Sequence, residues 1–187
     1  MDSKLQIISG AYRGRKLVLP DGARPTQNLA RGAIFNMLAE ILSIGDKIVV
    51  WDAFAGSGAL GLEILSRYPD STAVFTDVSV EAIKTIRKNT DGIAANRIRI
   101  VNTDAAKVIK NYANDINLVF VDPPYADSGL GIKFVKKLAE SVRPGTIVVQ
   151  EIETNVPYSP DETKWNVLRD KKYGRARFLI LRRNGNK

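Results

Sequence analysis

The apolar positions of this chain follow two alternating periods from residue 47 onward. Short apolar runs, as long as buried strands, are separated by stretches in which apolar residues recur every three or four positions, as on one face of a helix. The runs that we interpret as strands are residues 48–51, 73–75, 98–101, 118–121 and 146–152. The stretches that we interpret as helices are residues 57–68, 80–89, 105–112 and 131–141. This alternation predicts a parallel sheet covered on both faces and wound right-handed.

The two ends of the chain depart from this pattern. Residues 5–19 alternate loosely around two glycines, which predicts a small β-hairpin. An amphipathic helix over residues 29–42 follows, and Gly45 should end it. Near the other end, residues 165–168 and 175–181 are strand-like with no helix between them, so one of the pair should run antiparallel. We therefore expect a mostly parallel seven-stranded α/β sheet with an antiparallel C-terminal strand and a hairpin-and-helix extension.

Length and composition set further bounds. The 187 residues suit one domain, with residues 1–45 as the basic extension and residues 46–187 as a Rossmann-like core. The sequence contains no cysteine or histidine, which excludes disulfides, thiolate or imidazole metal sites and Ser-His-Asp triads, and we expect no metal. No apolar run reaches the length of a membrane span, and the first residues lack the apolar core of a signal peptide. We expect a cytoplasmic monomer that does not associate with a membrane.

The net charge of +8 is concentrated at the two ends of the chain. Residues 1–31 hold six Lys and Arg against two Asp and Glu, and residues 163–187 hold nine against one, so the middle of the chain is acidic. Basic ends that only maintain solubility are one explanation. Concentrated positive charge is also the footprint that nucleic-acid-binding proteins present to a polyanion, so we expect a nucleic acid as partner.

A glycine-rich turn follows the first predicted strand. The strand ends at Asp52, and Gly56, Gly58 and Gly61 form a G-x-G-x-x-G pattern that opens the next helix. Glycines permit a tight turn and let a ligand approach the backbone N–H groups at the helix start. The pattern indicates a nucleotide-like ligand; the alternative is that the glycines only allow a strand and a helix to pack closely.

Two further predicted strands end in acids. Asp77 lies twenty-one positions after Gly56, the spacing of a carboxylate that accepts hydrogen bonds from ribose hydroxyls. Asp104 and Ala105 follow the third strand and could lie against an adenine, although Asp104 could equally be a helix N-cap.

Either of two cofactors fits these strand ends. A nicotinamide dinucleotide would bring its pyrophosphate to the glycine turn, whereas S-adenosylmethionine would bring an amino acid there, with its ammonium near Asp52. An acid repels a pyrophosphate and attracts an ammonium. Asp52 therefore favours S-adenosylmethionine.

The fourth predicted strand ends in an unusual way. The apolar residues 118–121 are followed directly by Asp122, Pro123, Pro124 and Tyr125. In an open α/β sheet, ligands bind outside the carboxyl ends of the strands, so this placement suggests a site. The alternative is a buried strand followed by an ordinary Pro-Pro turn.

These motifs, in this order, resemble the class I S-adenosylmethionine-dependent methyltransferases that methylate exocyclic or amide nitrogens. More narrowly, the chain resembles the RsmD family of bacterial 16S ribosomal RNA guanine-N2 methyltransferases. The segments that carry the resemblance are LQIISGAYRGRKLVLP, RPTQNLARGAIFNML, WDAFAGSGALGLEILSR, NLVFVDPPY and KKYGRARFLILRR. The chain departs from the family pattern at Asn28 and Gly32, where an acid is common, which affects local salt bridges and not the chemistry.

The resemblance implies a role for each motif. Phe54, Ala55, Gly56 and Gly58 would line the methionine end of S-adenosylmethionine, with Asp52 near its amine. The other implied cofactor contacts are Asp77 to the ribose, Val78 beside the adenine, and Asp104 and Ala105 at the adenine edge.

The resemblance also implies how the target amino group is held. A guanine amino group is a poor nucleophile because its lone pair is delocalised into the ring. Asp122 and the carbonyl of Pro123 would accept hydrogen bonds from its two hydrogens, Pro123 and Pro124 would fix the backbone, and Tyr125 would stack on the base.

Basic residues near both ends would then bind the RNA. We expect ribosomal RNA or a small-subunit ribonucleoprotein to contact a phosphate-binding rim. The rim would consist of Arg13, Arg15, Lys16, Arg24 and Arg31, with Lys171, Lys172, Arg175 and Arg177 as a possible second contact.

Four other functions remain open from the sequence. Adenine-N6 DNA methyltransferases and protein-glutamine methyltransferases use similar chemistry, but the former usually carry an added recognition region and the latter typically begin the motif with Asn. A non-catalytic RNA-binding module would leave the motifs without a role. An NAD-linked oxidoreductase is the last alternative.

Overall fold

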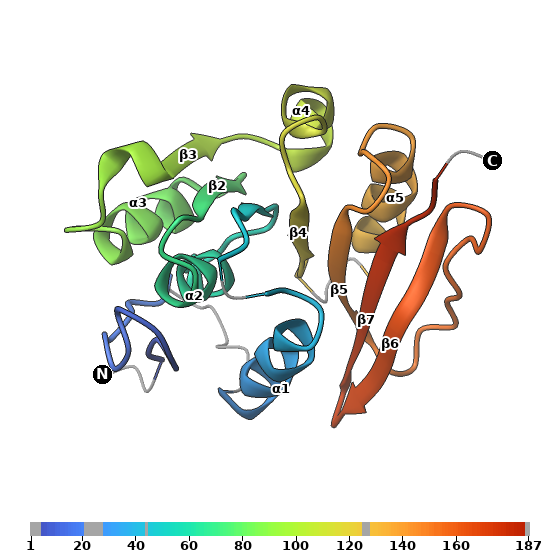
Figure 1. Cartoon of the computed structure of the whole chain (residues 1–187), viewed down its shortest axis with the longest axis horizontal. Helices are drawn as coiled ribbons and strands as arrows, with labels where there is room; N and C mark the ends of the chain where they lie inside the picture. The colour runs from blue at the N-terminus through green and yellow to red at the C-terminus, as the bar shows by residue number, and fades with distance from the viewer. Residues whose placement is uncertain (1–4, 21–27, 44, 125–127, 186–187) are drawn as a thin grey trace.

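The protein is described by a computed structural model that covers residues 5–20, 28–43, 45–124 and 128–185. Its centre is a seven-stranded sheet with the order β3-β2-β1-β4-β5-β7-β6 (Figure 1). The first five strands are parallel to one another, and β7 pairs antiparallel with both β5 and β6. The strands are β1 (Val49–Asp52), β2 (Thr72–Asp77), β3 (Ile98–Asn102), β4 (Leu118–Val121), β5 (Ile147–Glu153), β6 (Trp165–Tyr173) and β7 (Ala176–Arg183).

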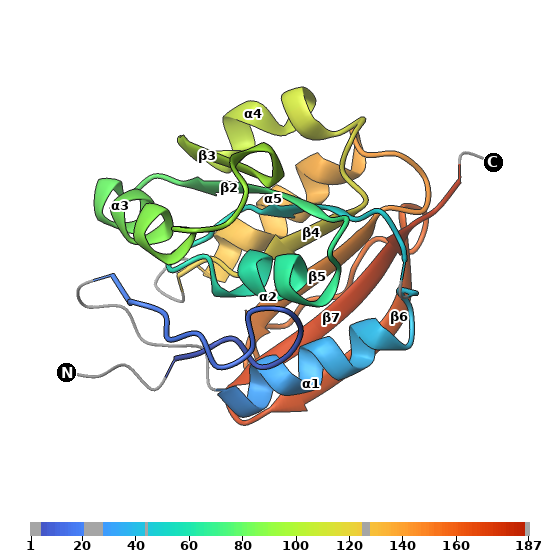
Figure 2. The same cartoon turned by 60° about the vertical axis from the view of Figure 1, so that its left-hand side comes forward.

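Helices cover both faces of the sheet. One apolar cluster joins the sheet to α1, α2, α3 and the N-terminal segment, and the second joins it to α4 and α5. In Figure 2, α4 lies above the sheet, and α1 and α2 lie below it. The helices are α1 (Asn28–Ala39), α2 (Ala59–Arg67), α3 (Val80–Asn89), α4 (Ala105–Tyr112) and α5 (Ser128–Ala139), with a 3₁₀ turn η1 (Ala95–Arg97). The predicted α/β sheet, with its antiparallel C-terminal strand, is confirmed.

Some boundaries differ from the prediction. Helix α2 begins at Ala59 and not at residue 57, because Gly58 before it has the left-handed conformation (φ 77°). Helix α1 ends at Ala39 and continues only as a turn. Strand β6 is longer than expected and reaches Tyr173, because it pairs with β7 along its length. The N-terminal segment pairs antiparallel with itself at the bridge between Gln6 and Lys16, and the backbone bonds Ile7 to Arg15 (3.0 Å) and Leu17 to Leu5 (2.9 Å) flank it, so the hairpin is present but short.

The N-terminal segment is held on α2 by buried polar groups. Both carboxylate oxygens of Glu63 accept backbone N–H groups, from Ile8 at 2.8 Å and Ser9 at 2.9 Å. The amide of Ala11 donates to the carbonyl of Ser66 at 2.8 Å. Glu63 has no exposed surface, and a buried carboxylate requires such partners. The extension is therefore part of the fold and not a separate arm.

Gly10 makes the close approach to α2 possible. Its φ is +84°, and a Cβ at this position would lie 2.0 Å from the carbonyl oxygen of Ser66. Gly14, in the same segment, has a similar φ of +80° but nothing within 4 Å of its Cβ position. These two glycines share a backbone conformation and differ in their surroundings.

Among the helices in the described part of the chain, none is long and apolar enough to cross a membrane.

The Gly10→Ala and Gly14→Ala variants separate these two effects. Gly14→Ala should lower the free energy of unfolding by about 1 kcal/mol, the usual cost of a left-handed conformation for a residue with a Cβ. Gly10→Ala should cost clearly more, because the segment must also move off α2. Denaturant unfolding measures both costs, and faster hydrogen exchange of the Ala11 and Tyr12 amides should accompany only Gly10→Ala. Equal costs in the two variants would contradict the close packing.

Candidate functional site

The candidate site lies where the order of the sheet reverses. Strands β1 and β4 are neighbours, but the chain leaves β1 toward β2 on one side and leaves β4 toward β5 on the other. Helix α2 therefore covers one face, and α5 covers the opposite face. Ligands of open α/β sheets bind in the crevice at such a reversal, outside the carboxyl ends of the strands.

The strand register brings the predicted residues to this edge. Asp52 at the end of β1 is level with Phe75 of β2 and with Phe120 of β4. Asp77 and Asp122 each lie two residues beyond this level, on opposite sides of β1. Two strand spacings separate β2 from β4, so these two acids flank β1 at a distance of roughly 10 Å.

The glycine turn bends sharply over Phe75. Gly56 and Gly58 both have positive φ, at 54° and 77°. A Cβ on Gly61 would lie 2.4 Å from the Phe75 ring, and one on Gly58 would lie 3.3 Å from it. The last two glycines of the pattern therefore allow the close packing of helix and strand that was the alternative explanation. This packing occupies the inner side of the turn, so a ligand could still bind on its outer side.

Several amide groups of the turn are available to a ligand. Gly58 and Gly61 donate within the protein, to the carbonyl of Ala55 at 2.6 Å and to a carboxylate oxygen of Asp52 at 3.0 Å. Within the described residues, the amides of Ser57, Ala59 and Leu60 have no acceptor. N–H groups at a helix start attract an anionic group such as a carboxylate.

Asp77 is held in place by the backbone of its neighbours. Its two oxygens accept the amides of Gly56 at 2.9 Å and Ser79 at 2.8 Å. The side-chain amide of Asn102 donates to the carbonyls of Asp77 and Val78, at 2.8 and 3.0 Å. Each carboxylate oxygen keeps a second lone pair, so Asp77 can still accept hydrogen bonds from a diol.

Asp52 is the most strongly perturbed acid of the site. It is 2% exposed, and burial raises its pKa to about 7. The amide of Gly61 lowers the pKa in opposition, and the charge of Asp77 raises it further. A cationic ligand group beside Asp52 would replace some of the lost solvation and favour the ionised form.

Apolar and aromatic surfaces surround these acids. Val78 is 71% exposed, and its position beside Asp77 leaves an apolar surface next to the site. Phe54 packs edge-on against Phe134 of α5, with ring centroids 5.3 Å apart. Asp104 caps α4 by accepting the amide of Ala106 at 2.9 Å, as one of the two alternatives predicted. Ala105, next to it, is buried.

The motif after β4 is fixed by packing against α5. Pro123 is buried and Pro124 is exposed. Gly131 of α5 lies under Pro123, so that a Cβ on this glycine would be 3.0 Å from the proline Cγ. Asp122 is half-buried, at the level of the site described above. Tyr125 lies outside the described residues.

The donor set fits S-adenosylmethionine better than a dinucleotide. An acid lies at the end of each of three strands, free amides lie at the turn, and an exposed apolar residue lies beside Asp77. An ammonium, a carboxylate, a ribose diol and an adenine each find a complementary group here. Among the described residues, no group of acids could hold a metal ion.

Comparison with known proteins agrees with this geometry. Residues 5–182 match the protein family described as "Conserved hypothetical protein 95". Ribosomal RNA small subunit methyltransferase D of Escherichia coli K12 is 34% identical over 186 residues, which cover 96% of this chain and 90% of that protein. The chain belongs to this family. The family resemblance drawn from the motifs is thereby confirmed, and the protein is a methyltransferase of RsmD type.

Solved structures agree with the fold of the family. The Escherichia coli protein yhhF superposes with a TM-score of 0.82 at 33% identity, covering 97% of this chain and 99% of that one. Trm1 of Pyrococcus horikoshii, solved with S-adenosyl-L-methionine, superposes with a TM-score of 0.72 at 14% identity, covering 91% of this chain and 60% of that one. The second likeness concerns the fold alone.

Asn89 of α3 is a residue of this site that the sequence reasoning did not assign. Its buried side-chain amide donates to the carbonyls of Val18 and Ser57, each at 2.8 Å, and accepts the amide of Val18 at 2.8 Å. The N-terminal segment is therefore tied to the glycine turn. In the sequence, only its position at the end of a predicted helix singles it out, and that position suggests a helix cap and not a contact between the N-terminal segment and the glycine turn.

The structure divides the residues predicted to bind RNA. Arg13 and Lys16 are exposed on the N-terminal segment, as expected of a phosphate-binding rim. Arg15 is half-buried and donates to the carbonyl of Asp91. Arg24 lies outside the described residues.

For Arg31 the expectation is corrected. Its side chain has no exposed surface and donates to the carbonyl of Gln6, so it does not contribute to a surface rim. Burial lowers its pKa, and the nearby charge of Glu63 raises it in opposition. Arg31 faces the junction of α1, α2 and the N-terminal segment because it lies on the apolar side of an amphipathic helix, beside buried Ile34 and Phe35.

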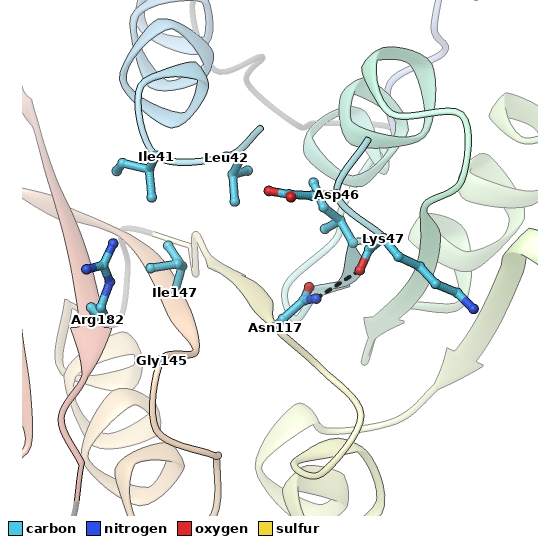
Figure 3. Close-up of a pocket in the computed structure, with 9 residues that line it drawn as sticks. Ile41, Leu42, Asp46, Lys47, Asn117, Gly145, Ile147 and Arg182 are labelled. Atoms are coloured by element: carbon cyan, nitrogen blue, oxygen red, sulfur yellow. Dashed lines mark hydrogen bonds between the residues drawn. The ribbon is translucent and has the colours of Figure 1, made fainter. Parts of the chain in front are cut away.

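A separate pocket lies at the opposite edge of the sheet (Figure 3). It has a volume of about 320 Å³, and its apolar lining residues are Ile41, Leu42, Ile48 and Ile147. The side chain of Asn117 bonds to the backbone of β1 and of Lys47 there, which fastens β4 to β1. This pocket lies at the amino ends of the parallel strands and contains none of the predicted site residues.

The raised pKa of Asp52 predicts how stability depends on pH in the absence of cofactor. Between about pH 4 and pH 7 the unfolded chain loses this proton and the folded protein keeps it, so stability should fall as pH rises. The slope should approach 1.4 kcal/mol per pH unit for this group alone. Asp52→Asn keeps an acceptor for the Gly61 amide and removes the titration.

Denaturant unfolding of both proteins at pH 5 and pH 8 tests this prediction. Asp52→Asn should gain stability relative to the original protein as pH rises. An equal pH dependence in the two proteins would mean that Asp52 titrates near its ordinary pKa.

Proposed function

We propose that this protein transfers a methyl group from S-adenosylmethionine to the exocyclic N2 of a guanine in 16S ribosomal RNA. The observation that carries the proposal is the placement of Asp77 and Asp122 on opposite sides of β1, at the carboxyl ends of the parallel strands. A cofactor that spans β1 from Asp77 would reach the motif that begins at Asp122. The substrate class is supported by the relative named ribosomal RNA small subunit methyltransferase D.

The cofactor would be bound by groups that lie along this edge. Asp77 would accept the ribose hydroxyls, and Val78 would cover one face of the adenine. Asp104 and Ala105 would meet the adenine edge. The turn from Phe54 to Gly58 would enclose the methionine end, and Asp52 would attract its ammonium.

Asp122 and Pro123 would hold the amino group that receives the methyl. Hydrogen bonds from both amino hydrogens, to the Asp122 carboxylate and the Pro123 carbonyl, draw the nitrogen lone pair out of conjugation with the ring. Pro123 is held against Gly131, so its carbonyl would have little freedom to move. Tyr125 is proposed to stack on the base.

When bound, S-adenosylmethionine supplies a methyl group on a positively charged sulfur, which departs as a neutral thioether as the new C–N bond forms. Asp122 is then the acceptor for the proton that the nitrogen releases, and water removes it from the site. No side chain forms a covalent bond to the substrate in this scheme. The main task of the protein is to align the nitrogen with the methyl group.

The N-terminal segment would carry part of the RNA contact. Arg13 and Lys16 are exposed on it, and Asn89 ties the end of this segment to the glycine turn. Phosphate contacts there would position the RNA relative to the cofactor, and base contacts in the pocket would select the guanine.

Nucleoside mass spectrometry tests the proposal directly. The purified protein is incubated with S-adenosylmethionine and either 16S ribosomal RNA or small ribosomal subunits lacking the modification, and the RNA is digested to nucleosides. We expect N2-methylguanosine to form. Parallel reactions contain DNA or protein in place of the RNA, and N6-methyladenine or methylglutamine formed there, without N2-methylguanosine in the RNA, would establish one of the alternative methyltransferases. Calorimetry with a nicotinamide dinucleotide, which should not bind, tests the oxidoreductase.

The Asp122→Ala variant tests the role of the motif. Turnover should fall by about 100-fold or more, because the amino group loses an acceptor. Affinity for S-adenosylmethionine, measured by calorimetry, should change little. The matched control is Asp115→Ala, which removes an exposed acid before the start of β4 and should leave turnover intact. Loss of cofactor binding together with turnover would show that Asp122 maintains the fold or the cofactor site.

A further inference from the structure

We propose that the β6–β7 turn is a second RNA-binding element, in which Lys171 binds a phosphate and Tyr173 stacks on an unpaired base. The inference rests on the proposed function only in taking RNA as the ligand. Its basis is the position of a short basic and aromatic sequence, Lys-Lys-Tyr-Gly-Arg, near the carboxyl ends of the parallel strands, where the proposed site lies.

The strand register places this turn beyond the carboxyl ends of the parallel strands. Val121 of β4 is level with Gln150 of β5, so Asp122 is level with Glu151. The turn begins two residues farther along, where Glu153 is paired with Ala176 of β7 and Ala176 with Tyr173 of β6. At about 3.3 Å per residue, the turn rises roughly 7 Å beyond the level of Asp122.

The lateral distance also suits one RNA. Strand β7 lies two positions from β4 in the sheet and β6 lies three, which at about 4.8 Å per strand corresponds to roughly 10–15 Å. A few consecutive nucleotides of an RNA strand can span that distance. An RNA whose base enters the pocket at β4 would therefore pass the β6–β7 turn with its neighbouring nucleotides.

Lys171 and Tyr173 point to the face of the sheet that carries α1. Lys171 is opposite Phe178 and Tyr173 is opposite Ala176, and directly opposed residues of an antiparallel pair share one face. Phe178 and Ala176 belong to the cluster that contains α1 and the N-terminal segment. Figures 1 and 2 both show the β6–β7 turn beside the first turn of α1. Lys172 is opposite Arg177 and points to the other face.

The hydrogen bonds of the turn show which basic side chains are engaged by the protein and which can contact a ligand. Arg177 forms two hydrogen bonds with Asp170, at 2.9 and 2.7 Å, and a third with the carbonyl of Tyr158, so it supports the hairpin. Arg175 pairs with Glu153 at 2.8 Å. Among the described residues, no salt bridge or hydrogen bond holds the ammonium of Lys171, which is exposed.

Tyr173 presents an aromatic ring to solvent on the same face. It is 40% exposed, and its ring lies beside that of Phe178 at an interplanar angle of 50°, with centroids 6.0 Å apart. An exposed ring held by a neighbouring buried ring is a platform on which a base can stack, and such stacking tolerates any sequence. A lysine two residues away supplies the phosphate contact that usually accompanies it.

A different explanation for these lysines is protection of an edge. Strand β6 is the last strand of the sheet, and edge strands often carry lysines that prevent pairing with other chains. That explanation predicts the same role for Lys171 and Lys172, and it gives no role to an exposed tyrosine. The two explanations therefore predict different results for neighbouring substitutions.

The test compares Lys171→Glu with Lys172→Glu, which change the same charge on adjacent exposed residues of one strand. Affinity for 16S ribosomal RNA transcribed in vitro is measured at several salt concentrations. Lys171→Glu should weaken binding about tenfold at low salt and lower the slope of log affinity against log salt by about one. Lys172→Glu should have a clearly smaller effect. Affinity for S-adenosylmethionine and the melting temperature are measured alongside.

Substitutions of Tyr173 give an independent readout. Tyr173→Leu keeps an apolar cover over Phe178 but cannot stack, so RNA affinity should fall about tenfold with an unchanged salt slope. Tyr173→Phe should bind like the original protein. Equal effects of Lys171→Glu and Lys172→Glu, or an unchanged affinity in Tyr173→Leu, would overturn the proposal. RNA binding is measured without turnover, so it tests this inference separately from the proposed function. If the protein binds RNA but forms no N2-methylguanosine, the proposed function is contradicted, and the binding of the variants still tests the role of the turn.

Discussion

The arrangement of this molecule depends on one constraint, the parallel pairing of β1 with β4 at the centre of the sheet. Because the chain leaves these neighbouring strands in opposite directions, the helices that follow them must lie on opposite faces, and no helix can close the space above their carboxyl ends. Each of the two strands then leads to an acid at these ends, Asp52 at the end of β1 and Asp122 after β4. The glycine turn and the Asp-Pro-Pro motif are far apart in sequence, yet this pairing brings them to one edge.

The N-terminal extension adds a second layer to the same edge. Glu63 and Ser66 hold it to α2, and Asn89 links its end to the carbonyl of Ser57 in the glycine turn. These partners are buried, so breaking any one of them leaves a polar group without compensation. The basic side chains on the extension are thus supported by the same elements that shape the cofactor turn. The extension therefore holds its basic side chains at a fixed position relative to the glycine turn.

Much of the fold could be predicted from the sequence because its strands are continuous apolar runs and its helices follow each of them through short connections. That the acids and glycines meet at one end of the sheet could also be predicted, since the carboxyl ends of parallel strands lie together. The burial of Arg31 could not be predicted from charge, because its surroundings come from the N-terminal segment and α2, more than twenty residues away. Asn89 was missed for the same reason: its partners Val18 and Ser57 are distant in sequence.

Asp52 lowers the stability of the free protein through its burial, and the same burial would favour binding of a cation. An apolar residue in its place would avoid the cost of burying a carboxylate, but it would leave the amide of Gly61 without an acceptor. The acid meets that structural need with one oxygen, while its second oxygen accepts no hydrogen bond from the described residues. A carboxylate that is poorly solvated and only partly satisfied favours the arrival of a positive charge more than a solvated one does, because less solvation has to be removed. The same burial that makes the Asp52 carboxylate costly in the free protein would therefore strengthen its proposed attraction for an ammonium.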